Sequence, residues 1–327
     1  MNYPTITIVV PTYNEEKNIV ACLQSIRRQN YPQKSVEIII VDNYSIDQTT
    51  ILAKNYSVKI FKNRIRHAEV SKMLGFRKAK GEFVFYLDAD IQLRGKNWLK
   101  EMINPFYHDK RITGVFTRYY SNKDSSPIER YLNLDPLQRD GIYRFFSPNL
   151  DTLVEKKEPG YWLLKYSPDR ILPAGLCVYR RKELMSLVGR YSMFLELDFL
   201  VLFVLKGLNV FAYVPTAGLY HRHVSSLQNL LQKRRYNLEK VYLARGKRLY
   251  KWFDLTTPAG FLKIVGWIIW SNLLIPSIIV GFVRSAKHSS WVGLYEPVIN
   301  FLVTDMLVVN LLCKGGFGKV LAKPTLE

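Results

Sequence analysis

Three short runs of apolar, β-branched or aromatic residues, each followed at once by polar side chains, constrain the fold of this chain most strongly. The runs cover residues 6–10, 36–41 and 81–87, and segments with helical periodicity separate them. Runs of this kind are typical of buried strands. Strands that alternate with helices predict a mostly parallel sheet. Parallel strands end at one edge of a sheet, so the polar clusters are expected to meet in the crevice where such sheets bind ligands.

Asp88 and Asp90 follow the third run, with Ala89 between them. Two carboxylates at a strand end supply the hard oxygen ligands that Mg²⁺ or Mn²⁺ prefers, and such an ion can carry a substrate diphosphate. A D-x-D sequence is equally common in solvated acidic turns, so the motif alone leaves both interpretations open. The polar clusters at the other two strand ends favour the ligand site. These clusters are Tyr13 and Glu15, then Asp42, Asn43, Ser45 and Asp47.

Charge and cysteine content bound the partners and the compartment. The 327 residues carry a formal net charge of +20, which suggests nucleic acid or an anionic membrane surface. The sequence shows no zinc-ligand spacing, RNP-like strand or helix-turn-helix pattern, and this argues against nucleic acid. Cys22, Cys177 and Cys313 form neither a metal-binding spacing nor a disulfide framework, so a reducing cytoplasm is expected. The start of the chain does not resemble a signal peptide.

Taken together, residues 10–16, 41–49 and 81–90 resemble the family 2 glycosyltransferases. The resemblance implies an α/β fold of the GT-A nucleotide-diphospho-sugar transferase type, which is a Rossmann-like mixed sheet flanked by helices. It also implies an inverting, metal-dependent enzyme that uses a UDP- or GDP-linked sugar as its donor.

By the same resemblance, individual positions acquire roles. Asp42 would read the edge of the base, and Asp90 would hold Mn²⁺ or Mg²⁺ together with Asp88, which would also face ribose or sugar hydroxyls. Lys72 keeps a positive charge where the family often has Ala-Arg-Asn, although the neighbouring Met73 lacks the amide. The implied nucleotide contacts in this half of the chain are Pro11, Thr12, Tyr13, Glu15, Asp42, Asn43, Ser45, Lys72, Asp88 and Ala89.

The middle of the chain is expected to bind the acceptor. Residues 117–170 are irregular and rich in aromatic residues and proline, which fits an acceptor-binding lid and a packed subdomain equally well. Residues 171–179 return to strand character. The resemblance places such a strand beneath the donor sugar, where Gly175 would permit a close approach.

A helix expected to end near Gly207 carries the candidate general base. The family places its base at the start of this helix, and counting back from Gly207 puts Glu196 at that position and Asp198 at a neighbouring acidic one. Carboxylates two residues apart on a helix point to different faces, so Glu196 is preferred. Asp is usual there, and Glu196 is therefore a departure with a longer reach. The alternative, above all for Asp198, is that it caps the helix.

His221 follows a strand expected at residues 210–215. By resemblance it is a candidate for a further metal ligand, and an exposed loop histidine is the alternative.

Residues 232–236 resemble the Q-x-x-R-W sequence of membrane-bound polysaccharide synthases, with Tyr in place of Trp. They lie on a helix expected from residue 227 to about residue 243. By resemblance Gln232 is a further contact of the nucleotide sugar, Arg235 braces the leaving diphosphate and Tyr236 stacks near the acceptor. A solvated basic face is the alternative.

Two apolar segments close the chain. Residues 259–283 hold one charge, Lys263, and are long enough to cross a bilayer with a kink at Pro276. Residues 291–313 form a second, weaker segment. A membrane-spanning hairpin is the first expectation, an interfacial or re-entrant pair the second, and a pair of soluble helices the third. Asp305 would need a partner in lipid, and Lys263 is the candidate.

The sequence therefore predicts a nucleotide-sugar-binding half at residues 1–116, an acceptor-binding half at 117–255, and a membrane-associated hairpin and tail at 256–327. The expected enzyme moves a sugar to a hydroxyl of a lipid-linked or polysaccharide acceptor, at the cell membrane with its catalytic domain in the cytoplasm. The alternatives are a processive polysaccharide synthase subunit, a nucleotidyltransferase with a similar cleft, and a non-catalytic membrane protein that binds an anionic polymer.

Overall fold

The structure is a computed structural model, and its contacts divide the chain into two compact units. Unit 1 consists of Met1–Tyr119 and Asp151–His221, and unit 2 consists of Tyr120–Leu150 and Arg222–Glu327. The residues that the structure describes are 3–221, 224–239, 249–251 and 257–313.

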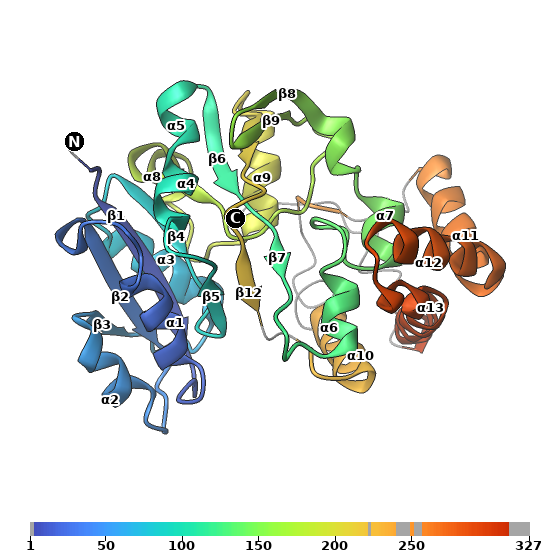
Figure 1. The fold of residues 1–327 in the computed structure, drawn as a ribbon, viewed down its shortest axis with the longest axis horizontal. Coiled ribbons are helices and arrows are strands. Elements are labelled where there is room, and N and C mark those ends of the chain that lie inside the picture. Colours follow the sequence, from blue (N-terminus) through green and yellow to red (C-terminus); the bar gives the residue numbers. More distant parts are fainter. Residues whose placement is uncertain (1–2, 222–223, 240–248, 252–256, 314–327) are drawn as a thin grey trace. The chain divides into compact units, whose positions relative to one another are not determined.

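A nine-stranded mixed sheet forms the centre of unit 1 (Figure 1), in the order β3-β2-β1-β4-β10-β6-β11-β9-β8. The first four strands of that order pair in parallel, as β6 does with β11, and the remaining pairs are antiparallel. The expected parallel sheet is thus present in its N-terminal half. The bounds are β1 Ile6–Thr12, β2 Val36–Asp42, β3 Lys59–Lys62, β4 Phe83–Tyr86, β6 Ile112–Phe116, β8 Val154–Glu158, β9 Tyr161–Lys165, β10 Val178–Arg180 and β11 Val210–Tyr213.

Helices cover this sheet and bury β1 along its whole length. A strand buried on both faces needs a continuous apolar run rather than an alternating one, which explains the sequence of the first run. Helix α3 packs so closely on β1 that a Cβ at Gly75 would clash with Val9. The helices of unit 1 are α1 Ile19–Arg27, α2 Thr49–Ala53, α3 Ala68–Lys78, α4 Trp98–Ile103, α5 Pro105–His108, α8 Arg181–Val188 and α9 Glu196–Leu205, with 3₁₀ turns at Gln33–Ser35, Lys54–Tyr56 and Leu150–Leu153.

A second, three-stranded sheet brings a distant histidine to the D-x-D motif. It consists of β5 Ile91–Leu93, β12 Leu219–His221 and β7 Tyr119–Tyr120. In the antiparallel pairing of β5 with β12, His221 lies opposite Ile91, the residue after Asp90.

Residues 171–177 do not form the strand expected there. Only Val178–Arg180 pairs with its neighbours, as β10. Leu176 has a φ of 64°, which lies outside the strand region. This turn of the backbone aims two N–H groups at Glu196, as described below.

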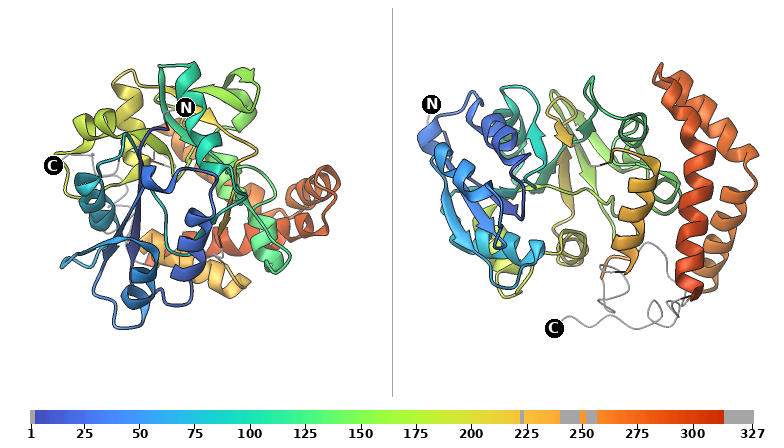
Figure 2. Two further views of the ribbon diagram at one scale, coloured as in Figure 1. Left: turned by 60° about the vertical axis from the view of Figure 1, so that its left-hand side comes forward. Right: turned by 90° about the horizontal axis from the view of Figure 1, so that it is seen from below.

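Unit 2 is helical (Figure 2). Its helices α6 and α7 come from the middle of the chain and pack with the C-terminal helices around a core that includes Tyr131, Val292, Ile299 and Val303. The compact units therefore do not follow the three consecutive segments expected from the sequence. The bounds are α6 Pro127–Leu132, α7 Gly141–Phe146, α10 Leu227–Tyr236, α11 Pro258–Asn272, α12 Ile275–Lys287, η5 Trp291–Tyr295 and α13 Glu296–Cys313.

The first C-terminal apolar segment is broken. Helices α11 and α12 meet at an angle of 76°, and Leu274 at the break has a φ of 58°. The expected kink is present, with Pro276 in the first turn of α12. Within the described residues, Trp291–Cys313 is one helical stretch long and apolar enough to cross a membrane. Asp305 accepts a hydrogen bond from Asn272 rather than pairing with Lys263, whose ammonium lies over the ring of Phe146.

Candidate active site

The loops after β1 and β2 are locked together around the carboxylate of Asp42. Asp42 is fully buried and accepts hydrogen bonds from Thr12 Oγ1 at 3.2 Å, Ser45 Oγ at 2.5 Å and Lys62 Nζ at 2.6 Å. Burial alone would raise the pKa of Asp42, but Lys62 and Ser45 outweigh it and hold that pKa below its ordinary value. The neighbouring Asn43 is also buried, and its side-chain oxygen accepts bonds from Asn63 and Ser71, each at 2.9 Å.

Two expected nucleotide contacts lie at the surface of the same loops. Tyr13 is 52% exposed, so its ring is available to stack on a base. Glu15 lies near Asp88 and Asp90, and burial followed by the charges of these two residues raises its pKa. Thr12 is buried beside Asp42, and Pro11 lies within β1.

The D-x-D motif lies between a buried lysine and the distant histidine. Asp90 Oδ2 is 3.1 Å from His221 Nε2. Asp88 Oδ1 is 3.9 Å from the ammonium of Lys72. The structure thus brings together the three residues that the sequence suggested for the metal, with Lys72 beside them, while Ala89 is buried between the two carboxylates.

The chemistry of these side chains fits a divalent cation. Burial raises the pKa of Asp88, Lys72 opposes this change, and the charge of Asp90 adds to it. A cation would relieve the mutual repulsion of Glu15, Asp88 and Asp90. Among the described residues, no three His, Cys, Asp or Glu side chains converge closely enough to hold an ion by themselves. Oxygen atoms of a diphosphate or of water would therefore have to complete its coordination.

Glu196, at the start of α9, is partly buried and is surrounded by hydrogen-bond donors. Its Oε2 accepts bonds from Tyr86 Oη at 2.5 Å and the N–H of Leu176 at 2.7 Å. Its Oε1 accepts bonds from the N–H of Cys177 at 3.0 Å and Tyr179 Oη at 3.3 Å. Burial nevertheless raises the pKa of Glu196 above its ordinary value, although these bonds oppose the shift.

Tyr86 and Lys72 connect this carboxylate to the D-x-D motif. The Lys72 ammonium lies 3.9 Å from the centre of the Tyr86 ring, within the range of a cation–π contact. Glu196 and Asp88 are therefore linked through two side chains of unit 1. Asp198, two residues after Glu196, is buried.

Sequence reasoning did not find Tyr86 or Tyr179 as parts of the site. Tyr86 stands two residues before Asp88 in a strand, where the sequence pattern indicates a core residue. The sequence feature that could have identified Tyr86 is its hydroxyl group, which stands in an otherwise apolar run at residues 83–87. Tyr179 and the amides of Leu176 and Cys177 depend on a backbone turn that the pattern of residues 171–179 concealed.

The residues of the Q-x-x-R-W-like sequence lie in unit 2, on one side of α10. Gln232, Arg235 and Tyr236 are exposed, as expected for positions i, i+3 and i+4 of one helix face. Arg235 pairs with Glu239 at 2.9 Å. Arg234 turns the other way and pairs with the buried Asp140 at 2.5 Å. The part of the expected helix beyond residue 239 lies outside the described residues.

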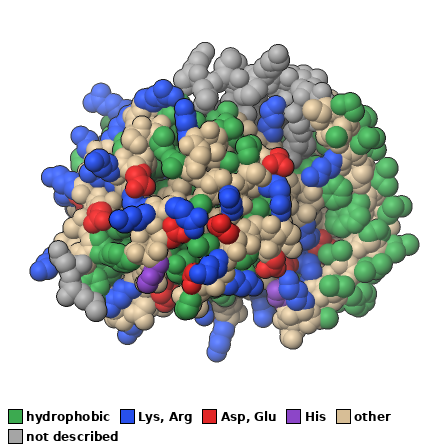
Figure 3. Space-filling model, turned by 90° about the horizontal axis from the view of Figure 1, so that it is seen from above, with side chains coloured by type: hydrophobic (Ala, Val, Ile, Leu, Met, Phe, Trp, Pro, Cys, Tyr) green, Lys and Arg blue, Asp and Glu red, His purple; other side chains and the backbone are tan. Residues whose placement is uncertain are grey.

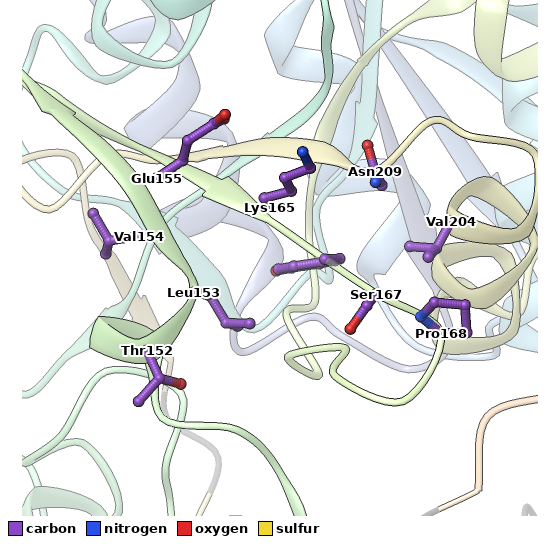
Figure 4. A pocket seen from close by; sticks show the side chains of 10 residues that line it. Thr152, Leu153, Val154, Glu155, Lys165, Ser167, Pro168, Val204 and Asn209 are labelled. Carbon is purple, nitrogen blue, oxygen red and sulfur yellow. The ribbon is translucent and has the colours of Figure 1, made fainter.

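A separate pocket of about 490 Å³ opens beside β8 and β9 (Figure 4). Lys165, Tyr166 and Asn209 are among its lining residues, and none of the expected site residues is.

Residues 7–185 match the family described as glycosyl transferase family 2. The chain belongs to this family. The resemblance and the transferase class expected from the sequence are thereby confirmed.

Two relatives from bacteria and archaea illustrate the match. The poly(ribitol-phosphate) beta-N-acetylglucosaminyltransferase TarS of Staphylococcus aureus is 32% identical over 102 residues, 29% of this chain and 18% of TarS. A dolichyl N-acetyl-alpha-D-glucosaminyl phosphate 3-beta-D-2,3-diacetamido-2,3-dideoxy-beta-D-glucuronosyltransferase of Methanococcus voltae is 31% identical over 151 residues, 42% of this chain and 46% of that enzyme. The chain thus spans less than half the length of either relative.

A solved structure shows the same fold. The mannosyltransferase PcManGT from Pyrobaculum calidifontis, in complex with GDP-Man and Mn²⁺, superposes with a TM-score of 0.52 and 16% identity. The superposition covers 96% of this chain and 88% of that chain. The GT-A-type α/β fold expected from the sequence is confirmed.

Proposed function

We propose that this chain transfers a sugar from a nucleoside diphosphate to a hydroxyl of a lipid-linked or polysaccharide acceptor, with inversion of the anomeric carbon. One observation carries the proposal. A partly buried carboxylate with a raised pKa, Glu196, is linked through Tyr86 and Lys72 to the Asp88–Asp90–His221 cluster, all within one compact unit. Transfer to a hydroxyl needs both a base and a site for the leaving diphosphate.

The loops after β1 and β2 would bind the nucleoside. Tyr13 offers an exposed ring, while Thr12, Asn43 and Ser45 shape the loops around Asp42. Because several donors already occupy the Asp42 carboxylate, its proposed role at the base edge includes holding this loop in position. Lys72 would face the diphosphate and offset its charge. A divalent ion bound beside Asp88, Asp90 and His221, with oxygens of the diphosphate or of water completing its coordination, would neutralise the charge that develops on the leaving group.

Glu196 would take the proton of the acceptor hydroxyl. A raised pKa strengthens a carboxylate as a base near neutral pH. All four of its hydrogen bonds are already made, so the acceptor must replace one donor. We infer that it replaces a tyrosine hydroxyl, because a side chain can change rotamer while the amides of Leu176 and Cys177 are fixed by the backbone.

A relative's name, the net charge and the C-terminal helices support the location and the acceptor. The printed name of the Methanococcus voltae relative includes a dolichyl phosphate saccharide, which supports a lipid-linked acceptor here. The net charge of +20 and the apolar C-terminal helices support a membrane partner. The buried free thiols of Cys22 and Cys177 suit the cytoplasmic face. In unit 2, Gln232, Arg235 and Tyr236 would contribute to the diphosphate and the acceptor end.

The test follows the products of a panel of UDP- and GDP-sugars in the presence of Mn²⁺ or Mg²⁺. Release of free nucleoside diphosphate that Asp90→Asn abolishes, and that the exposed-site control Asp169→Asn retains, supports sugar transfer. Release of pyrophosphate instead identifies a nucleotidyltransferase and overturns the proposal. Product length on a defined acceptor separates single transfer from processive synthesis.

A further inference from the structure

Large apolar side chains are concentrated at the surface of the C-terminal helices. Of 23 exposed large apolar or aromatic side chains in the described residues, 16 lie in α11, α12, η5, α13 and the α11–α12 break. Figure 3 shows hydrophobic side chains gathered at the right of the view. We call this set the apolar face. Its members are Phe261, Leu262, Ile269, Leu273, Leu274, Ile275, Ile278, Ile279, Phe282, Val283, Trp291, Leu294, Val298, Phe301, Val309 and Leu312.

We propose that the apolar face binds one leaflet of a lipid bilayer in the plane of the membrane, and that none of the helices α11–α13 crosses it. The proposal specifies how the protein would contact the membrane that the proposed function names as a partner. It rests on the proposed function only for that partner. An apolar surface of this extent marks an interaction site, and a helix layer that is apolar on one side only is typical of interfacial binding.

The opposite side of the helices α11–α13 is joined to the rest of unit 2 by buried ion pairs. Arg284 of α12 pairs with Asp135 at 2.8 Å and with Glu296 of α13 at 2.6 Å. Glu296 is fully buried and also accepts bonds from Tyr131 and pairs with Arg144. Asp135 lies between α6 and α7, so α12 and α13 are fixed to helices from the middle of the chain.

These ties oppose a spanning hairpin. The turn after α12 would be the far end of such a hairpin, about 30 Å from its base. His288 in that turn bonds Asp135 at 2.8 Å, so Asp135 and the charged segment around it would have to cross the bilayer as well. Helices α11 and α12 have 15 and 13 residues, which at 1.5 Å per residue is roughly 20 Å each.

Helix α13 is also held along its length by a polar neighbour. Ile299 and Val303 of α13 share a core with Leu230 of α10, and Leu311 near its other end packs on Leu238. If α13 crossed a bilayer, α10 would enter the hydrocarbon beside it. The exposed Gln232 and Arg235 of α10 would then face lipid at high cost.

Charge selects a bilayer over a second copy of the chain as the occupant of the apolar face. The segments of unit 2 contain 19 Lys and Arg against nine Asp and Glu. Two such units would repel one another, whereas anionic headgroups attract them. Lys263 and Lys287 are exposed on the same helices, although Lys287 also lies 3.3 Å from Asp135. Trp291 is of the type that settles at the membrane–water boundary.

The first test measures flotation of the full chain with preformed vesicles of phosphatidylcholine, with and without 30% phosphatidylglycerol. We expect binding to the anionic vesicles and at least a tenfold weaker partition for Ile279→Glu combined with Phe282→Glu. The control combines Ile51→Glu with Leu205→Glu in unit 1, whose side chains are similarly exposed, and should bind as the parent does. Equal loss in both pairs, or no binding by the parent, overturns the proposal.

The second test reports topology without disturbing the apolar face. Ser289→Cys in a Cys313→Ser background places one accessible thiol in the turn after α12, since Cys22 and Cys177 are buried. In vesicle-bound protein, a membrane-impermeant maleimide added outside should label it as completely as in free protein, and protection would demonstrate spanning. A dimer seen by sedimentation without lipid, and dissolved by the Ile279→Glu and Phe282→Glu pair, would instead assign the face to a second copy. Sugar transfer to a water-soluble acceptor is assayed in parallel, so failure of the membrane inference leaves the proposed function standing.

Discussion

At the scale of single residues, Glu196 shows how burial and hydrogen bonding oppose one another in a candidate base. Desolvation raises its pKa, and two amides with two tyrosine hydroxyls limit the rise. The balance decides the pH at which this carboxylate can accept a proton. Tyr86 is the member of the ring that also contacts Lys72, and it is therefore the informative position to change.

Replacing Tyr86 by Phe should move the pH profile of the enzyme. The lost hydroxyl favours the charged form of Glu196, so its removal raises the pKa of Glu196 and shifts the acid limb of kcat/KM to higher pH. A hydrogen bond to a charged group is worth about 1.5–3 kcal/mol, so kcat/KM on the acid limb should fall at least about tenfold. Tyr107→Phe, at an exposed site in the same unit, should change neither. A fall in activity with an unmoved profile would assign Tyr86 a purely structural role.

At the scale of elements, contact between helix and strand depends on small residues at particular places. Gly75 lets α3 approach β1, where a Cβ would clash with Val9. Gly266 in α11 has no such neighbour, since the nearest atom to its built Cβ is in Phe145 at 3.9 Å. Close packing therefore requires glycine at position 75, whereas the space around Gly266 would accept a larger side chain.

Gly75→Ala should destabilise the protein, while Gly266→Ala should not. Overpacking of a fitted core costs about 1–3 kcal/mol, whereas alanine in a helix with free space gains up to about 1 kcal/mol over glycine. Urea unfolding followed by circular dichroism measures both changes. Equal effects of the two substitutions would contradict the close α3–β1 packing.

The tie between α12 and the α6–α7 connection should be visible in the pH dependence of stability. Burial alone would raise the pKa of Asp135, but Arg284 and His288 outweigh it and hold that pKa below its ordinary value. A depressed pKa contributes stability above the unfolded-state value of about 3.9, and that stability is lost as pH falls towards the folded-state value.

Asp135→Asn should therefore lower the free energy of unfolding at pH 7 by about 3 kcal/mol, since it removes one of the two carboxylates that pair with the buried Arg284. The difference from the parent should shrink as the pH falls below about 4. Unfolding by urea at pH 7, 4 and 3 measures it, with Asp124→Asn, an exposed position in unit 2, as the control. A difference that does not depend on pH would contradict the ion-pair interpretation.

At the scale of the whole molecule, substrate and metal are expected to stabilise the chain together. A ligand that binds only the folded state at 100 times its dissociation constant adds about 2.7 kcal/mol. The nucleotide sugar that serves as donor should raise the melting temperature in the presence of Mn²⁺ or Mg²⁺, and EDTA should remove most of this gain. Asp90→Asn should lose the metal-dependent part, while Asp169→Asn keeps it. A gain that EDTA leaves intact would place the nucleotide in a site without metal.

The sequence by itself determined the sheet, the meeting of three polar strand ends and the family. The sheet and its strand ends follow from local periodicity and from the alternation of strands with helices, which leaves few arrangements. The family follows from the resemblance of residues 10–16, 41–49 and 81–90. Asp90 and His221 were proposed as metal partners from the resemblance to the family, and the pairing of β5 with β12 brings them to 3.1 Å. The ring of donors around Glu196 depends on a turn at Leu176, and a run of apolar residues does not predict such a turn.

Only the tertiary structure decided how the C-terminal helices are attached to the middle of the chain. As a sequence, the segments at residues 259–283 and 291–313 are apolar enough for a membrane span. In the folded chain, however, Glu296 and Arg284 meet Asp135, Tyr131 and Arg144 from a segment more than 100 residues away. Buried charges must find partners, and the partners lie at a separation that no local pattern encodes. Those contacts give the helices one polar, attached side and one apolar, free side.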